Sequence, residues 1–169
     1  MAPFSEDDIA NAYAHYGVQL QGVEAAENTP RIEDIILAVL ETPPPGRFVS
    51  MLPTLILKNH EKIDFNYIKS KTNAQTSSKL GYILDVSISC SQEIRKLRDQ
   101  QELQQTLRSA ISNLAPSPLP IVWVPEKLKI FYRPEDFTPQ EPHEKKWCIS
   151  TKYDLETFIR HAREYIRDA

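Results

Sequence analysis

The chain has 169 residues and a formal net charge of −3. This is the length of one ordinary domain, long enough to bury a hydrophobic core without disulfides or a structural metal. No apolar run approaches the roughly 18 residues that a membrane span needs, and the acidic N-terminus has no apolar signal segment, so we expect a soluble, unprocessed, cytoplasmic protein that does not enter a membrane.

The charges are unevenly distributed along the chain. Residues 1–42 carry eight acids and one base, residues 43–110 carry ten bases and six acids, and the remainder carries nine of each. The acidic N-terminal part disfavours DNA binding there, because a duplex rewards Lys and Arg. The basic middle has two interpretations: a surface for nucleic acid or an acidic protein, or the solvated polar sides of amphipathic helices.

Two helices are expected near the N-terminus. Ser5 followed by Asp8 has the pattern of a capping box, and apolar residues recur at helical spacing after it, which predicts a helix over about 5–16. Thr29 and Pro30 have the chemistry of a helix cap and of a first helical residue. An apolar stripe follows them and predicts a second helix, which must stop before a run of prolines.

The stretch 47–89 is expected to form three short helices in succession. Asp64 has the chemistry of an N-cap for the second helix, and Thr76 or Ser77 for the third. Gly81 falls inside the third helix, where glycine costs roughly 1 kcal/mol against alanine. We therefore expect a neighbouring helix to approach the backbone closely at Gly81.

The pattern changes after the next helical segment. Residues 91–114 have an apolar stripe and a polar face rich in Gln and Arg, without a strict heptad, which predicts one or two helices packed on the domain. Residues 121–124, 128–132 and 147–150 are β-branched and aromatic and are expected to be strands. Between the last two, a proline-containing segment reads as an extended loop, and 153–167 predicts a closing amphipathic helix.

These elements predict an α+β fold. Its N-terminal two-thirds are mostly helical, a small antiparallel sheet of about three strands lies near the C-terminus, and the closing helix covers that sheet. Residues 1–42 are expected to be an acidic two-helix segment that precedes a main domain over 43–169.

The cysteine and histidine pattern does not predict catalysis. Cys148 and His143 are close in sequence, but Cys148 falls in an apolar strand pattern, which favours a structural thiol over a nucleophile. Cys90 and Cys148 have no CxxC partner and are expected to be reduced. The remaining histidines have no partner at metal-ligand spacing; they are His15, His60 and His161.

The sequence also does not indicate a metal site made of acidic residues or a glycine-rich loop that binds phosphate. A solvated surface is favoured over a divalent-cation site for the N-terminal acids, because no loop turns them inward; these acids are Glu24, Glu27, Glu33 and Asp34. With four glycines the chain has no phosphate-binding loop. We therefore predict no cofactor, no metal and no catalytic residue.

Four short segments carry a family resemblance. They are Leu52-Pro-Thr-Leu-Ile-Leu, Phe65-Asn-Tyr-Ile, Lys79-Leu-Gly-Tyr-Ile-Leu-Asp85 and Lys146-Trp-Cys-Ile-Ser. Together, over residues 47–151, they resemble the C-terminal domain of the AbiEi family, the antitoxins of abortive-infection, type IV toxin–antitoxin systems. The third segment is similar to the "RLGYLLE" helix of that family.

The resemblance implies a protein-interaction or neutralising role beside a nucleotidyltransferase-like toxin, without a catalytic residue. Members of the family usually begin with a basic winged helix that binds operator DNA. This chain has acidic residues and two expected helices at that position, which argues against autoregulation by DNA binding.

The leading functional prediction is a non-catalytic, antitoxin-like regulatory protein that binds a partner protein in a prokaryotic defence setting such as phage defence. The expected contact surface is the exposed positions around Tyr82 and the polar face of residues 91–114, including Arg95, Arg98 and Arg108. The alternative is a nucleic-acid-binding module that uses the basic segment 43–110; its candidate residues are Lys58, Lys62, Lys69, Lys71 and Lys79. An enzyme with a concealed site is a third alternative, and the oligomeric state is not indicated.

Overall fold

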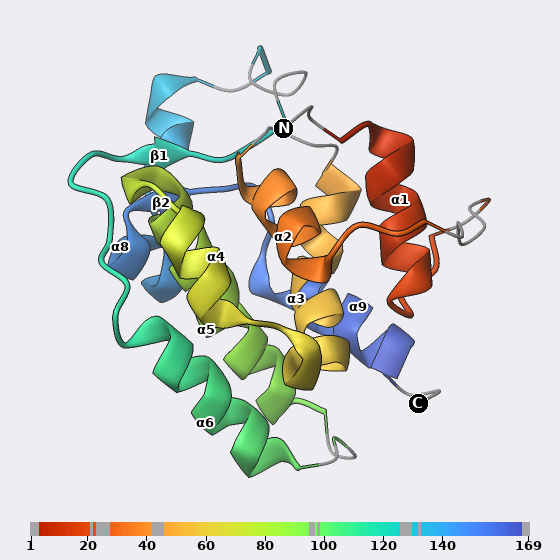
Figure 1. Cartoon of the computed structure of the whole chain (residues 1–169). Coiled ribbons are helices and arrows are strands. Elements are labelled where there is room, and N and C mark those ends of the chain that lie inside the picture. The colour runs from red at the N-terminus through yellow and green to blue at the C-terminus, as the bar shows by residue number, and fades with distance from the viewer. Residues whose placement is uncertain are drawn as a thin grey trace.

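The computed structural model describes residues 4–20, 22, 28–41, 46–94, 97, 99–125, 130–131 and 133–166. Within these residues, eight α-helices contribute to one buried apolar cluster, and only two short strands are present (Figure 1). None of the helices in these ranges is long and apolar enough to cross a membrane.

The two expected N-terminal helices are present. α1 (Glu6–His15) begins at the predicted capping box, in which the Asp8 amide donates to the Ser5 hydroxyl oxygen at 3.1 Å and the Ser5 amide donates to the Asp8 carboxylate at 2.9 Å. α2 (Ile32–Glu41) begins later than predicted, so Thr29 and Pro30 precede its first turn.

The N-terminal helices share the core with the rest of the chain. Tyr13 of α1 is fully buried and its hydroxyl donates to the Phe48 carbonyl at 2.7 Å. Side chains from both sides of residue 42 belong to the same buried cluster. The division into a segment over 1–42 and a domain over 43–169 stays a prediction.

Three successive helices occupy the central stretch, as predicted. They are α3 (Gly46–Asn59), α4 (Phe65–Lys71) and α5 (Ala74–Gln92), and a short 3-10 turn, η1 (His60–Lys62), lies between the first two. Their apolar faces supply many of the fully buried side chains, among them those of Phe48, Leu52, Ile56 and Ile68.

The N-cap of α4 is the residue that the sequence predicts, whereas the N-cap of α5 is a different residue. Asp64 caps α4, because its carboxylate accepts from the Tyr67 amide at 3.0 Å. α5 is capped by Asn73 and not by Thr76 or Ser77. Thr76 is the third residue of that helix and returns the hydrogen bond, since its hydroxyl oxygen accepts from the Asn73 amide at 2.8 Å.

The long helical pattern at 91–114 is shared between two helices. α5 continues to Gln92, and α6 (Gln100–Ile111) begins after a break. Leu103, Leu107 and Ala110 of α6 are buried, and the helix packs on α5 (Figure 1).

The predicted antiparallel three-stranded sheet is wrong. β1 (Ile121–Val122) pairs in parallel with β2 (Ile149–Ser150), so that Ile121 lies opposite Ile149. Of the strand predicted over 128–132, the described residues 130 and 131 form an exposed turn, and the others lie outside the described residues. The fold is therefore helix-rich with a minimal parallel sheet.

The prolines explain why the sheet prediction failed. The segment expected to be an extended loop contains η2 (Pro134–Phe137) and α8 (Pro142–Trp147), each with proline in its first turn, where the missing amide costs nothing. Parallel strands need a crossover connection between them, and these two helical segments supply it. The closing helix, α9 (Leu155–Ile166), is present, but it packs mainly on α3 and α5, so the prediction that it covers the sheet is wrong.

Gly81 permits the close approach that the sequence predicts. The Trp147 indole, at the end of α8, lies against Gly81 of α5, and a Cβ added at Gly81 would come under 3.0 Å from three of its ring atoms. The indole amine donates to the Asp85 carboxylate at 2.6 Å. The Ser78 hydroxyl donates to the Trp147 carbonyl and accepts from the Ser117 amide at 3.1 Å. One face of α5 therefore holds the C-terminal crossover in place.

Candidate functional site

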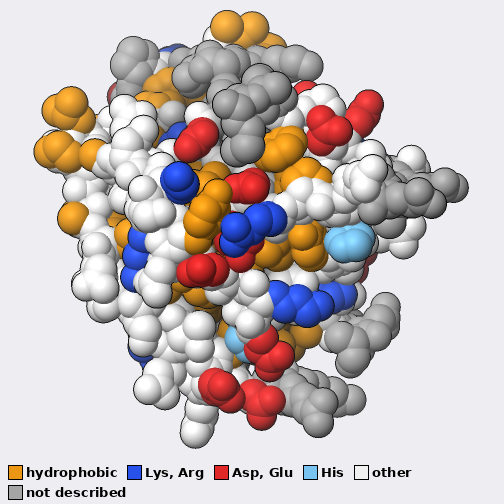
Figure 2. Space-filling view, in the orientation of Figure 1, with side chains coloured by type: hydrophobic (Ala, Val, Ile, Leu, Met, Phe, Trp, Pro, Cys, Tyr) orange, Lys and Arg blue, Asp and Glu red, His pale blue; other side chains and the backbone are white. Residues whose placement is uncertain are grey.

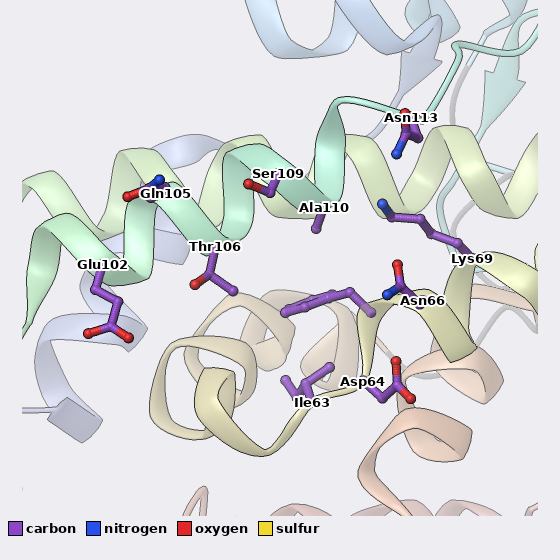
Figure 3. A pocket seen from close by; sticks show the side chains of 11 residues that line it. Ile63, Asp64, Asn66, Lys69, Glu102, Gln105, Thr106, Ser109, Ala110 and Asn113 are labelled. Carbon is purple, nitrogen blue, oxygen red and sulfur yellow. The ribbon is translucent and has the colours of Figure 1, made fainter.

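An open groove of about 510 Å³ lies between the start of α4 and the length of α6 (Figure 3). Its buried apolar residues are Ile63, Phe65 and Ala110. Polar side chains from both helices form its edges: Asp64, Asn66 and Lys69 on the α4 side, and Glu102, Gln105, Thr106, Ser109 and Asn113 on the α6 side. The groove thus joins an apolar floor to a polar rim.

The α4 side of the groove is fixed to α2 by a buried carboxylate. Glu33 is only 4% exposed, and its carboxylate accepts from the Asp64 amide at 2.8 Å and from the Arg31 side chain at 3.3 Å. Each hydrogen bond to a charged group contributes about 1.5–3 kcal/mol. Glu33 therefore holds the entry to α4 in one position.

A second contact between α2 and α4 is centred on Tyr67. Its hydroxyl donates to the Asp34 carboxylate at 3.1 Å, and the Arg31 guanidinium lies 4.4 Å from the centre of its ring. A guanidinium over an aromatic face is attracted by the ring quadrupole. The aromatic ring and the carboxylates together orient α4 relative to α2.

The α6 side is fixed to α5. The Gln100 side-chain amide donates to the Ser91 carbonyl at 2.7 Å, and the Gln104 amide donates to the Ser91 hydroxyl oxygen at 3.1 Å. Leu103 and Leu107 face the core on the same side of the helix. The two walls of the groove are therefore anchored to different helices, and each wall is held by polar and apolar contacts.

The groove can bind a chain segment with mixed polarity. Its floor offers apolar contact, while amides, hydroxyls and charged groups at the rim can donate and accept hydrogen bonds. Among the residues that the structure describes, no three His, Cys, Asp or Glu side chains are grouped so as to hold a metal ion.

Two of the five lysines proposed for nucleic acid donate to backbone carbonyls, and a third, Lys71, lies 5.7 Å from the ring centre of Tyr67 on its own helix. The Lys58 ammonium donates to the Gly17 carbonyl at 2.8 Å and to the Tyr165 carbonyl at 3.2 Å. The Lys79 ammonium donates to the Leu40 carbonyl at 2.9 Å and lies 5.4 Å from the Trp123 ring centre. Both lysines therefore connect helices within the fold.

The other three lysines lie around α4. Lys62 and Lys71 are exposed, and Lys69 lines the groove. Figure 2 shows acidic and basic side chains interspersed over the visible face, without a continuous basic area. Whether these lysines bind nucleic acid stays a prediction.

The residues proposed for a protein partner are not brought together. Tyr82 is 1% exposed, with its ring against Trp123 and Phe158, so its expected exposure is wrong. The physical reason is that Tyr82 lies in a part of α5 that is buried on both sides of Gly81: Leu80 and Ile83 are also buried. Arg108 is exposed and donates to the Gln104 side chain at 3.3 Å. Arg95 and Arg98 lie outside the described residues.

The cysteines and histidines do not form a reactive pair. Burial raises the pKa of the Cys90 thiol to about 12, which keeps it protonated at neutral pH. Cys148 caps α8 with φ 56°, where it turns the chain into β2. The His143 imidazole lies 3.0 Å from the Ser89 hydroxyl oxygen.

His161 on α9 predicts a dependence of stability on pH. Burial lowers its pKa below 6.5, with Arg160 acting in the same direction and Glu164 opposing them, and its Nδ1 has no partner among the described residues. The unfolded chain then binds the proton more tightly, so stability is full above pH 6.5 and falls as the pH drops through the lowered folded value. Urea unfolding at neutral and mildly acidic pH should show a smaller loss for His161→Gln than for the wild type; an equal loss would contradict this.

The sequence reasoning missed the groove and the carboxylate that supports it. The sequence pattern predicts a solvated acidic surface at Glu33, although the position of this residue in the first turn of an apolar helix is compatible with burial. The polar face of α6 was singled out, but nothing local indicates that it lies opposite the start of α4.

Comparison with models of protein families, with curated proteins and with solved structures finds no match to this chain.

Proposed function

We propose that this chain is a non-catalytic interaction protein that binds a partner protein through the groove between α4 and α6. The observation that carries the proposal is the groove itself: two separately anchored walls, an apolar floor and a rim of hydrogen-bonding groups. Interaction sites commonly combine an apolar centre with a polar rim.

A protein partner accounts for the charge of this site better than nucleic acid does. Asp64 and Glu102 stand at the rim beside the single base Lys69. A polyanion would be repelled by such acids, because its binding depends on neutralising phosphates with Lys and Arg. The internal contacts of Lys58 and Lys79 also reduce what they can offer to a phosphate backbone.

The class of partner comes from the AbiEi resemblance. It supports an antitoxin-like regulatory role in a prokaryotic defence setting, with a nucleotidyltransferase-like toxin as the protein bound. One of the four segments that carry the resemblance includes a groove residue, because Phe65 lies in the floor.

A matched pair of variants tests the proposal. Ser109→Arg places a long charged side chain into the groove from an exposed position on α6, whereas Gln101→Arg introduces the same residue at an exposed position of α6 that does not line the groove. Tagged versions of both, and the wild type, are purified from native cells, and co-purifying protein and nucleic acid are measured. We expect a stoichiometric protein partner with the wild type and Gln101→Arg, reduced at least about tenfold with Ser109→Arg.

Two results would contradict the proposal. One is a partner that is retained equally by Ser109→Arg and Gln101→Arg, which would place the interface elsewhere. The other is an eluate that contains nucleic acid and no protein partner, which would favour the nucleic-acid alternative. Circular dichroism and urea unfolding of both variants check that the fold is unchanged.

A further inference from the structure

The charges of the groove are separated along its length. Glu102 lies toward the N-terminal end of α6, and the Lys69 side chain extends from α4 toward the opposite end, near Ala110 and Asn113 (Figure 3). From Glu102 to Ala110 the rise along α6 is about 12 Å. A ligand in the groove would therefore meet a carboxylate at one end and an ammonium at the other.

The charges of Glu102 and Lys69 are both available to a ligand. No ion pair found in the described part of the chain includes Glu102 or Lys69. The third charged residue of the rim, Asp64, uses its carboxylate to cap α4 through the Tyr67 amide. The Asp64 carboxylate keeps its negative charge, but this hydrogen bond fixes its position, whereas Glu102 and Lys69 have no ion-pair partner in the described part of the chain.

The middle of the groove has a different character. Phe65 is a buried residue of its floor, and Thr106 and Ser109 flank it without a charge. An apolar side chain placed there removes apolar surface from water without burying a charge. The order along the groove is therefore an acidic end at Glu102, an apolar and neutral middle, and an end where Lys69, the one base among the lining residues, lies together with the Asp64 carboxylate (Figure 3).

We propose that the groove binds a short segment of the partner in which an apolar side chain lies between a basic and an acidic residue. The basic residue pairs with Glu102 and the acidic residue pairs with Lys69. This inference rests on the proposed function. At about 3.3 Å per residue, four extended residues span about 13 Å, close to the rise of about 12 Å along α6 from Glu102 to Ala110. Charge complementarity of this kind selects the partner and fixes its register more than it raises affinity.

The test uses random linear peptides displayed on yeast and selected against the purified full chain. On the wild type we expect enriched peptides with an apolar residue between one base and one acid. Glu102→Lys places an ammonium at each end, so its enriched peptides should carry acids on both sides. Lys69→Glu makes both ends acidic, so its enriched peptides should carry bases on both sides.

Measured affinities give the size of the effect. A wild-type-selected peptide should bind Glu102→Lys at least about tenfold more weakly than the wild type, with Glu102→Gln intermediate. Peptides that bind through the groove are identified by their loss of binding to Ser109→Arg. If the wild type, Glu102→Lys and Lys69→Glu all enrich groove-binding peptides with the same charge pattern, this inference is overturned and the proposed function still stands. If no enriched peptide is sensitive to Ser109→Arg, both are contradicted.

Discussion

Replacing Gly81 by alanine is expected to destabilise the protein by about 3 kcal/mol, the upper end of the usual cost of overpacking. In an ordinary helix the same change stabilises by roughly 1 kcal/mol, because alanine has the higher helix propensity. Here the new methyl group would overlap the Trp147 ring, which is held by its own hydrogen bond to Asp85 and is only 2% exposed. Urea unfolding of the wild type and the variant measures the difference.

The Trp147→Leu background isolates the cause. The smaller side chain removes the overlap at its own cost in stability, so adding Gly81→Ala to it should change the free energy of unfolding by less than about 1 kcal/mol, in either direction. An equal loss in both backgrounds would show that the tryptophan is not what requires glycine at this position.

Replacing Glu144 by alanine is expected to cost about 3 kcal/mol, since removing a buried acceptor leaves its donors unsatisfied. The Glu144 side chain is 4% exposed, and its carboxylate accepts from the Thr151 amide at 2.8 Å and the Glu141 amide at 3.2 Å. These contacts join the start of α8 to the chain just after β2. Chemical unfolding with amide hydrogen exchange measures both the global loss and the local opening of α8.

Glu144→Gln is the control for the shape of the side chain. Its carbonyl oxygen can replace only one of the two acceptor oxygens, so we expect a loss smaller than that of alanine and larger than zero. If alanine at this position costs no more than a typical exposed substitution, within about 0.5 kcal/mol, the carboxylate does not hold α8 and β2 together.

Local signals in the sequence predict the helices well. The Ser5 and Asp8 pair and the Asp64 cap depend on hydrogen bonds within three residues, and the apolar stripes depend on a fixed period along one element. Gly81 also carries a usable signal, because a glycine inside a strong helix needs a reason outside the helix. These features can be recognised without knowing the tertiary structure.

Features that depend on distant partners were not predictable in the same way. β1 and β2 are separated by a crossover, and the prolines that begin η2 and α8 have the same appearance in sequence as prolines of a loop. The acceptors of Lys58 and Lys79 are carbonyls far along the chain, so their charge indicated only a basic segment.

The groove shows the same limit. Its α4 residues and its α6 residues are more than thirty positions apart, and the α6 set alone has the composition of a solvent-exposed helix face. Asp64 was predicted as a cap and Lys69 as a contact for nucleic acid, and the polar face of 91–114 as a surface for a protein. Only their arrangement in space places Asp64, Lys69 and part of that polar face around one groove.

Hydrogen exchange of the full chain, alone and bound to its co-purified protein partner, tests the central proposal most directly. We predict that the partner slows exchange at amides of residues 63–69 and 102–113, the two walls of the groove, and that Ser109→Arg abolishes this protection while Gln101→Arg preserves it. Protection confined to other elements, such as α1 and α9, would contradict the proposal that this groove is the site of interaction.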